Sequence, residues 1–327
     1  MQNENAMSEH LNFSSAGEAG LKFALVMPTL NAAAFLGPWI ESFNGQTVKP
    51  GKVLIIDSAS GDGTADLARL ANFEVVVIPR RDFNHGGTRQ AAAQMLGDFQ
   101  VVVFVTQDVV FADKHSLSSL LSSFTDADVG AAYGRQLPHL GAGPIGAHAR
   151  LFNYPAQGRV VSREDIPGLG LKAAFLSNSF SAYRQTALNA VGGFPTKTIM
   201  NEDTFVAAKM LLSGMKVAYA SNAQVRHSHD YTMLQDFRRY FDIGVFHARE
   251  AWLSERFGHA EGEGFRFLKS EISYLWKERP ELIPKALGHT FAKYAGYRLG
   301  LIEKRLPAAI KTRFSMHKAY WKADAES

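Results

Sequence analysis

Short apolar runs alternate with longer segments of mixed polarity from residue 21 to about residue 135. The runs predict strands at 23–27, 53–56, 74–78 and 101–105, and the segments between them predict helices at 32–43, 64–71 and 88–96. Because nearly every position in these runs is Val, Ile or another apolar residue, the strands should be buried on both faces. The alternation predicts an α/β fold whose central sheet is mostly parallel and has flanking helices.

The pattern loosens after residue 135. Residues 136–172 are rich in Gly and Pro and predict a long, partly helical connection. Further strands are expected at 173–178 and 216–220, with a helix at 203–213 between them. After about residue 232 the pattern is helical to the end of the chain, which predicts a C-terminal helical region.

Composition excludes several classes of protein. The chain has 327 residues, of which 46% are hydrophobic and 20% charged, as in a packed globular protein. The absence of cysteine excludes disulfides, thiolate zinc sites and cysteine nucleophiles. Residues 1–20 carry no Lys or Arg, and the longest apolar runs fall far short of the roughly 18–20 residues of a membrane span. We therefore expect a cytoplasmic protein that is attached to a membrane surface at most.

Polar residues and glycines follow four of the predicted strands. They are Pro28–Asn31, Asp57–Thr64, Arg80–Arg89 and Thr106–Asp108. Each alone is consistent with a turn and a helix N-cap, but four at the same edge of one sheet favour a polar ligand that carries phosphates. The chain lacks G-x-G-x-x-G after the first strand, a P-loop and a G-x-S-x-G elbow, which disfavours dinucleotide dehydrogenases, P-loop enzymes and α/β-hydrolases.

The order of these motifs resembles that of inverting glycosyltransferases of family 2, which have the Rossmann-like GT-A fold. The matching residues are Pro28-Thr29-x-Asn31, Asp57-Ser58-x-Ser60-x-Asp62-Gly63-Thr64, Gly86-Gly87-Thr88-Arg89, Gln107-Asp108, Gly192-Gly193-Phe194, Glu202-Asp203 and His227–His229. The resemblance covers roughly residues 22–250 and is strongest to bacterial rhamnosyltransferases that use dTDP-L-rhamnose to build surface polysaccharides. It implies transfer of a sugar, L-rhamnose by this likeness, to a hydroxyl of a glycan or a polyprenyl-linked acceptor.

On this resemblance we expect three regions: a flexible leader at 1–20, a GT-A catalytic domain at 21–235, and a helical, basic region at 236–327. Two alternatives remain open. One is a transferase of another sugar from a UDP donor, because a carboxylate at residue 57 does not distinguish thymine from uracil. The other is a catalytically degenerate subunit that binds a nucleotide-sugar.

The resemblance assigns the strand-end residues to the nucleotide-sugar donor. The expected donor-binding residues are Pro28, Thr29, Asn31, Asp57, Ser60, Gly86, Gly87, Arg89, Gln107 and Asp108. Asp57 would accept a hydrogen bond from the pyrimidine N3–H, and Arg89 would meet the pyrophosphate or the base edge. Gly86 and Gly87 would let the backbone approach the ligand closely, or would form a plain turn.

A divalent cation, Mg²⁺ or Mn²⁺, is the expected cofactor. By resemblance, Asp108 is the last carboxylate of a D-x-D motif, and Thr106 stands where the first Asp is usual. With one carboxylate fewer, the metal should depend more on the donor phosphates and on a histidine, His227 or His229. Their i, i+2 spacing after a predicted strand would put them on opposite faces, so one at most should bind.

Asp203 is the expected general base, because inverting transfer needs a carboxylate to take the proton of the acceptor hydroxyl. Asn201-Glu202-Asp203 also suits a helix start, where acids complement the helix dipole. Residues 235–240 resemble the Q-x-x-R-W element of processive relatives, so that Arg238 and Arg239 would contact the diphosphate. The other interpretation of this basic pair is a solvated helix face.

The C-terminal segment is strongly basic. Residues 281–327 hold nine Lys and Arg against four Asp and Glu, a net charge of +5, interleaved with apolar and aromatic side chains. This mixture predicts an amphipathic segment on an anionic membrane surface, in keeping with a polyprenyl-linked acceptor. The alternatives are a helical subdomain packed on the catalytic domain or on a second subunit of a homo-oligomer, and nucleic acid, which we do not expect as a partner.

Overall fold

The computed structural model describes residues 20–258 and 262–321, so the expected leader lies outside the described residues except for Gly20. Its first half follows the predicted alternation. The strands are β1 (Phe23–Thr29), β2 (Lys52–Asp57), β3 (Glu74–Val77) and β4 (Val101–Val105), and the helices between them are α1 (Ala33–Asn44), α2 (Thr64–Leu70) and α3 (His85–Met95). These strands pair in parallel in the order β3-β2-β1-β4, which confirms the predicted α/β fold.

The second half makes the sheet mixed. Its strands are β5 (Val110–Phe111), β6 (Val129–Leu137), β7 (Arg159–Val161), β8 (Phe180–Arg184) and β9 (Lys216–Arg226). Strand β8 runs antiparallel between β4 and β6, whereas β6 and β9 are parallel. The short strands β5 and β7 pair antiparallel with β9.

One predicted strand is wrong. Residues 170–174 form a 3-10 turn, and the strand of this region begins only at Phe180. Ala173, Ala174 and Leu176 are buried in the core, so their apolar character reflects packing rather than strand pairing. A short apolar run alone does not distinguish these two cases. The predicted strand at 216–220 is present and continues to Arg226.

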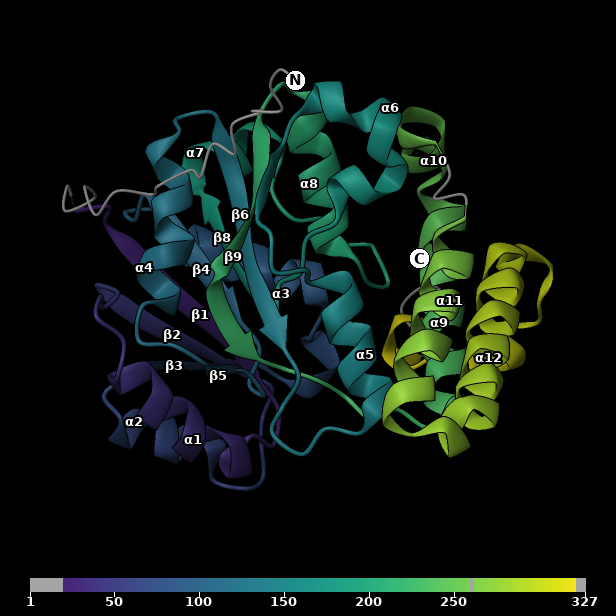
Figure 1. Cartoon of the computed structure of the whole chain (residues 1–327). Helices are drawn as coiled ribbons and strands as arrows, with labels where there is room; N and C mark the ends of the chain where they lie inside the picture. The colour runs from purple at the N-terminus through teal and green to yellow at the C-terminus, as the bar shows by residue number, and fades with distance from the viewer. Residues whose placement is uncertain (1–19, 259–261, 322–327) are drawn as a thin grey trace, which may run out of the picture.

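Successive residues of β1 pack into two cores on opposite faces of the sheet, as strand geometry requires. Leu25 and Met27 share one core with α1 and α4 (Ser116–Leu121). Ala24 and Val26 share the other with α3 and α8 (Glu202–Leu212). The sheet therefore lies between two helical layers (Figure 1).

The chain is helical from Met233 onward, as expected. The remaining helices are α5 (Pro144–Asn153), α6 (Ile166–Leu169), α7 (Gln185–Ala190), α9 (Met233–Arg249), α10 (Ala251–Phe257), α11 (Glu263–Glu278), α12 (Ile283–Leu301) and α13 (Ala308–Phe314). Helix α9 adds Phe241 and Phe246 to the core of the sheet, and a domain boundary at residue 235 stays a prediction. Within residues 20–258 and 262–321, none of the helices combines the length and hydropathy of a transmembrane span.

Helices α9 and α12 lie side by side, with their backbones in close approach (Figure 1). A Cβ atom on Gly296 would lie 2.1 Å from the carbonyl oxygen of Phe237, and one on Gly300 would lie 2.1 Å from that of Phe241. Only glycine fits at such distances, so these two positions set how closely α12 approaches α9.

Candidate active site

Two adjoining cavities open at the carboxyl ends of the strands. The larger, of about 1140 Å³, lies between the ends of β4 and β9, the start of α8, and helices α5 and α9; Asp108, Asp203 and His229 line it. The smaller, of about 630 Å³, is lined at its base by Pro28, Thr29 and Gln107. His85 lines both cavities, as does a residue of the C-terminal segment described below.

Asp108, His227 and His229 converge on one point of the larger cavity. An oxygen of Asp108 lies 3.2 Å from Nε2 of His227 and 3.4 Å from Nε2 of His229. The candidate ligand atoms of the three residues all lie within 4.8 Å of one another. The expectation that the two histidines face opposite sides is wrong, because β9 ends at Arg226 and strand alternation does not extend to 227–229.

The hydrogen bonds of His227 indicate that this donor set suits a cation. Oε1 of Gln136 accepts a hydrogen bond from Arg150 (2.7 Å), so the atom that faces Nδ1 of His227 at 2.8 Å is an acceptor, and Nδ1 donates. Nε2 then presents its lone pair to Asp108. Burial lowers the pKa of His227, which disfavours a second proton there. A divalent cation between Nε2 and the carboxylate would remove the repulsion of their lone pairs.

The other two members of this cluster have protonation states that suit metal binding. Burial, followed by the charge that His227 would carry when protonated, lowers the pKa of His229 to about 4. Burial alone would raise the pKa of Asp108, but the hydrogen bond and charge that His227 would supply when protonated outweigh it and hold that pKa below its usual value. At neutral pH the cluster therefore offers an anionic oxygen and neutral imidazole nitrogen.

Asp203 lies in the first turn of α8 and lines the same cavity. Its carboxylate accepts hydrogen bonds from the backbone N–H groups of Asn178 (3.0 Å) and Thr204 (2.8 Å). Burial, and then the neighbouring charge of Glu202, raises its pKa to about 7. A carboxylate with this pKa is a far stronger base than an ordinary aspartate and is still ionised in part at neutral pH.

Arg89 is engaged with the protein. Its guanidinium lies 3.0 Å from Glu202 and donates to the carbonyl of His85, and the side chain of each member of the pair is about 5% exposed (5% and 6%). Glu202 also accepts a hydrogen bond from the Asn178 side chain (2.9 Å). Arg89 borders the larger cavity, so its contact with a donor stays a prediction, but the interaction that the structure shows is with Glu202.

Several expected donor-binding residues tie the loops after β1 and β2 together. Asp57 is 1% exposed and accepts hydrogen bonds from the hydroxyls of Thr29 (2.9 Å) and Ser60 (2.6 Å). The Asn31 N–H donates to Oγ of Ser60 (2.8 Å). The side chain of Gln107 holds the backbone of Leu30 through both of its polar atoms. A contact of Asp57 with a base stays a prediction.

The glycine pair approaches protein atoms closely. A Cβ on Gly86 would lie 1.8 Å from the carbonyl oxygen of Pro195, in the loop that leads to α8. The N–H of Gly87 donates to the side chain of Asn84 (2.8 Å), which caps α3. Gly86 therefore makes a close approach to Pro195, and glycine is needed there for packing. A contact of Gly86 or Gly87 with a donor stays a prediction.

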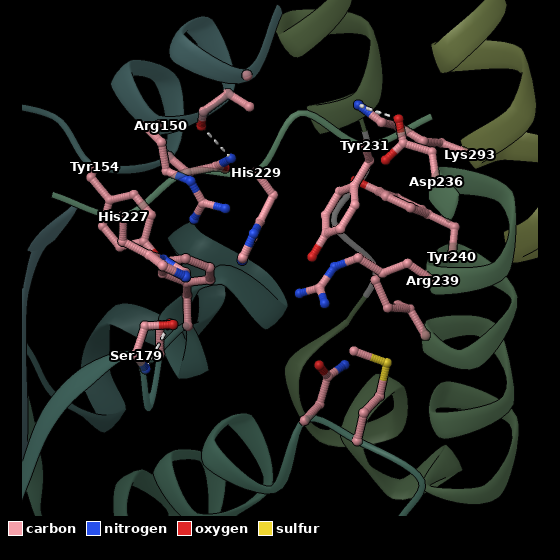
Figure 2. Close-up of a pocket in the computed structure, with 18 of the residues that line it drawn as sticks. Arg150, Tyr154, Ser179, His227, His229, Tyr231, Asp236, Arg239, Tyr240 and Lys293 are labelled. Carbon is pink, nitrogen blue, oxygen red and sulfur yellow. Dashed lines mark hydrogen bonds and ion pairs between the residues drawn. The ribbon is translucent and has the colours of Figure 1, made fainter. Parts of the chain in front are cut away.

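The two arginines of α9, Arg238 and Arg239, differ in their position relative to the cavities. Arg239 lines the larger cavity and lies over the ring of Tyr231, 6.0 Å from its centroid. Arg238 is half-buried and is absent from the lining of both cavities. Figure 2 shows Arg239 and Tyr231 pointing into the pocket from one side and His227 and His229 from the other. Arg150, on α5, also points into this pocket (Figure 2).

The chain is similar to known proteins of one family. The model of "Glycosyl transferase family 2" matches residues 24–192, which is more than half of the chain. The O-antigen chain rhamnosyltransferase WbaN of Salmonella anatum is 49% identical over 300 residues, which cover 91% of this chain and 95% of that protein. The O-antigen chain rhamnosyltransferase RfbN of Salmonella typhimurium is 47% identical over 302 residues, which cover 92% and 96%.

Solved structures share the fold at low sequence identity. The mannosyltransferase PcManGT of Pyrobaculum calidifontis, in complex with GDP-Man and Mn²⁺, superposes with a TM-score of 0.53 at 19% identity, covering 93% of this chain and 86% of that one. S. aureus TarS gives 0.52 at 17% identity, covering 87% and 55%. The fold and the cavity at its strand ends define a glycosyltransferase of the GT-A type. The chain belongs to glycosyl transferase family 2.

The raised pKa of Asp203 predicts a pH dependence of both activity and stability. A base with a pKa near 7 makes the transfer rate rise about tenfold per pH unit below pH 7 and level off above it, and Asp203→Asn should lower the rate by roughly 10²–10⁴-fold. The unfolded carboxyl ionises near pH 4, so between about pH 4 and 7 the folded state binds more protons and this group's contribution to stability falls as pH rises.

The measurement is thermal unfolding of wild type and Asp203→Asn from pH 4 to pH 8, together with the pH–rate profile of wild type. As pH rises, the melting temperature of Asp203→Asn should increase relative to that of wild type. Asp98→Asn, a change at an exposed aspartate, is the control and should show no such trend. A constant difference between Asp203→Asn and wild type at every pH would contradict the raised pKa.

Proposed function

We propose that this protein is an inverting glycosyltransferase that moves L-rhamnose from dTDP-L-rhamnose to a hydroxyl of a glycan or polyprenyl-linked acceptor. The choice of L-rhamnose rests on the two O-antigen chain rhamnosyltransferases that are 49% and 47% identical to this chain over almost their full lengths. The chemistry rests on one observation: a single cavity holds a carboxylate with a pKa of about 7 and a separate Asp–His–His cluster.

In this proposal Asp203 removes the proton of the acceptor hydroxyl as that oxygen attacks the anomeric carbon and the nucleoside diphosphate leaves. Asp108, His227 and His229 would hold a divalent cation. When bound, such a cation offsets the negative charge that grows on the leaving diphosphate. Arg239 adds a positive charge to the same cavity. No enzyme nucleophile is required, because inversion is a single displacement.

The His pair bears on the alternative of a degenerate subunit. That alternative arose because Thr106 replaces the usual first carboxylate of the metal motif. Two imidazole nitrogens lie beside Asp108 and can replace the missing carboxylate as metal ligands. They are neutral donors, which Mn²⁺ and similar metals accept. We therefore favour an active enzyme with an altered metal site.

A donor screen tests the proposed function. Purified protein is incubated with a glycan or lipid-linked acceptor mimic and with dTDP-L-rhamnose or common UDP-sugars, and products are detected by mass. We expect donor turnover with dTDP-L-rhamnose, slower by roughly 10²–10⁴-fold in Asp203→Asn. Turnover of a UDP-sugar alone would favour the alternative donor. Equal donor hydrolysis by wild type and Asp203→Asn would contradict the catalytic role of Asp203.

The metal cluster is tested by nucleotide binding. Asp108→Ala should weaken dTDP binding at least tenfold in Mn²⁺, since it removes the anionic ligand, and should have little effect in EDTA. His229→Ala should act in the same direction, and Asp66→Ala, a change in an exposed ion pair far from the cluster in sequence, should have no effect. Isothermal titration calorimetry measures these affinities. An equal loss for Asp108→Ala with and without metal would contradict a metal role.

We further propose that α12 contacts an anionic membrane at the cytoplasmic face. Leu287, Phe291 and Tyr294 are 45%, 71% and 60% exposed and, spaced by four and three residues, they share one face of the helix. Exposed basic residues follow at Arg298 and Lys304. An exposed apolar stripe with cations beside it suits the headgroup region of a bilayer, where a polyprenyl-linked acceptor would be held.

Vesicle sedimentation tests this contact. Phe291→Glu should reduce binding to vesicles that contain anionic lipid, because it puts a negative charge into the apolar stripe. The control is Leu140→Glu, at an 83% exposed leucine outside the C-terminal helices. If Phe291→Glu binds anionic vesicles as well as wild type does, α12 is not the membrane contact.

A further inference from the structure

The residues after α13 form part of the smaller cavity. We call residues 315–321 the C-terminal strap. Within it, Met316, His317, Lys318, Ala319 and Tyr320 line the cavity opposite the ends of β1 and β4. The sequence predicts that the basic tail, this stretch included, lies on an anionic membrane surface, with packing on the catalytic domain or on a second subunit as the alternative. Its position beside Thr29 and Gln107 indicates a different role.

Both ends of the strap are held by α9. At its start, the N–H of Met316 donates to the buried carboxyl of Asp242 (2.8 Å), next to the rings of Phe241 and Phe314. At its end, Arg249 donates to the hydroxyl of Tyr320 (2.8 Å) and lies 5.2 Å from the ring centroid of the buried Trp321. The residues between these anchors are thereby presented to the cavity.

The charges around this cavity favour an anionic ligand. Four basic residues line it, Arg80, Arg81, Lys197 and Lys318, against one acidic residue, Asp82. Lys318 is exposed, and it is the basic residue that the strap contributes. A cluster of cations at the edge of a cavity is the expected surroundings of a diphosphate.

His317 lies where the two cavities meet. It lines both of them, and its ring meets that of His85 edge to face, with the centroids 5.0 Å apart. A donor whose nucleoside occupies the smaller cavity and whose sugar reaches Asp203 in the larger one must pass this point with its diphosphate. His317 and Lys318 are therefore adjacent to the path of that group.

We infer that the C-terminal strap is a wall of the donor site, and that His317 and Lys318 contact the diphosphate of the bound nucleotide. The inference rests on the proposed function, since it takes a nucleoside diphosphate as the ligand of these cavities. It adds two binding residues from outside the segment that the family model matches, which ends at residue 192. It also explains why α9 holds the strap at both ends, because a mobile segment would give a poorly ordered site.

Binding of dTDP and of thymidine to the full chain tests the inference. Lys318→Ala should raise the Kd of dTDP about tenfold, in line with the loss of a charge-assisted contact, and leave that of thymidine unchanged. The effect on dTDP should shrink at high salt. His317→Ala should also weaken dTDP, and His317→Gln, which keeps a hydrogen-bond donor, should recover part of the loss. The matched control is Lys304→Ala, at an exposed lysine that lines neither cavity.

The outcomes separate the inference from the function on which it rests. Thermal unfolding first establishes that each variant is folded. If wild type binds dTDP, and Lys318→Ala and His317→Ala bind it equally well, the strap does not contact the diphosphate. An equal loss in Lys304→Ala would show a general effect of charge and would also overturn the inference. If wild type binds neither dTDP nor UDP, the proposed function fails and the inference fails with it.

Discussion

The ion pair between Arg89 and Glu202 is the interaction on which the site depends most. It joins α3, which follows the loop of the smaller cavity, to the start of α8, which carries Asp203. Both side chains are almost fully buried, so loss of either partner would leave an uncompensated charge at a cost of about 3–5 kcal/mol. The same carboxylate holds the Asn178 side chain and raises the pKa of Asp203. The buried Arg89–Glu202 pair therefore both holds α3 against α8 and affects the pKa of the proposed base.

The two halves of the sheet supply different parts of the site. The parallel half, from β3 to β4, ends in the loops that Asp57 and Ser60 hold together at the smaller cavity. The mixed half brings in β9, which pairs with β6 through a register shift after Gly134. That shift accommodates the extra residues of β9, and the chain leaves the strand with His227 beside Asp108. An irregular strand pair thus sets the position of the metal cluster.

The C-terminal helices complete the cavities as well as covering the core. Helix α9 contributes Phe241 to the interior and Arg239 to the larger cavity. The close approach of α12, which Gly296 and Gly300 permit, packs it against α9. The strap that follows α13 then returns to the strand ends. A view of the C-terminal region as a separate basic surface is accordingly too simple: its exposed stripe faces outward, while other residues of the same region line the site.

Local periodicity and short motifs were enough to predict the α/β alternation, the strand-end edge and most of the chemistry-bearing residues. They led to Asp108, Asp203 and the histidines, and to a family that the comparisons confirm. The folded chain was needed to show that both histidines meet Asp108, that Arg89 pairs with Glu202, and that Gly86 packs on Pro195. Those contacts join residues from 109 to 121 positions apart, and no local pattern encodes which distant partner a side chain meets. For the same reason the sequence did not show that the C-terminal strap packs beside the strand ends. A basic, aromatic segment has the same composition whether it covers a membrane or a cavity.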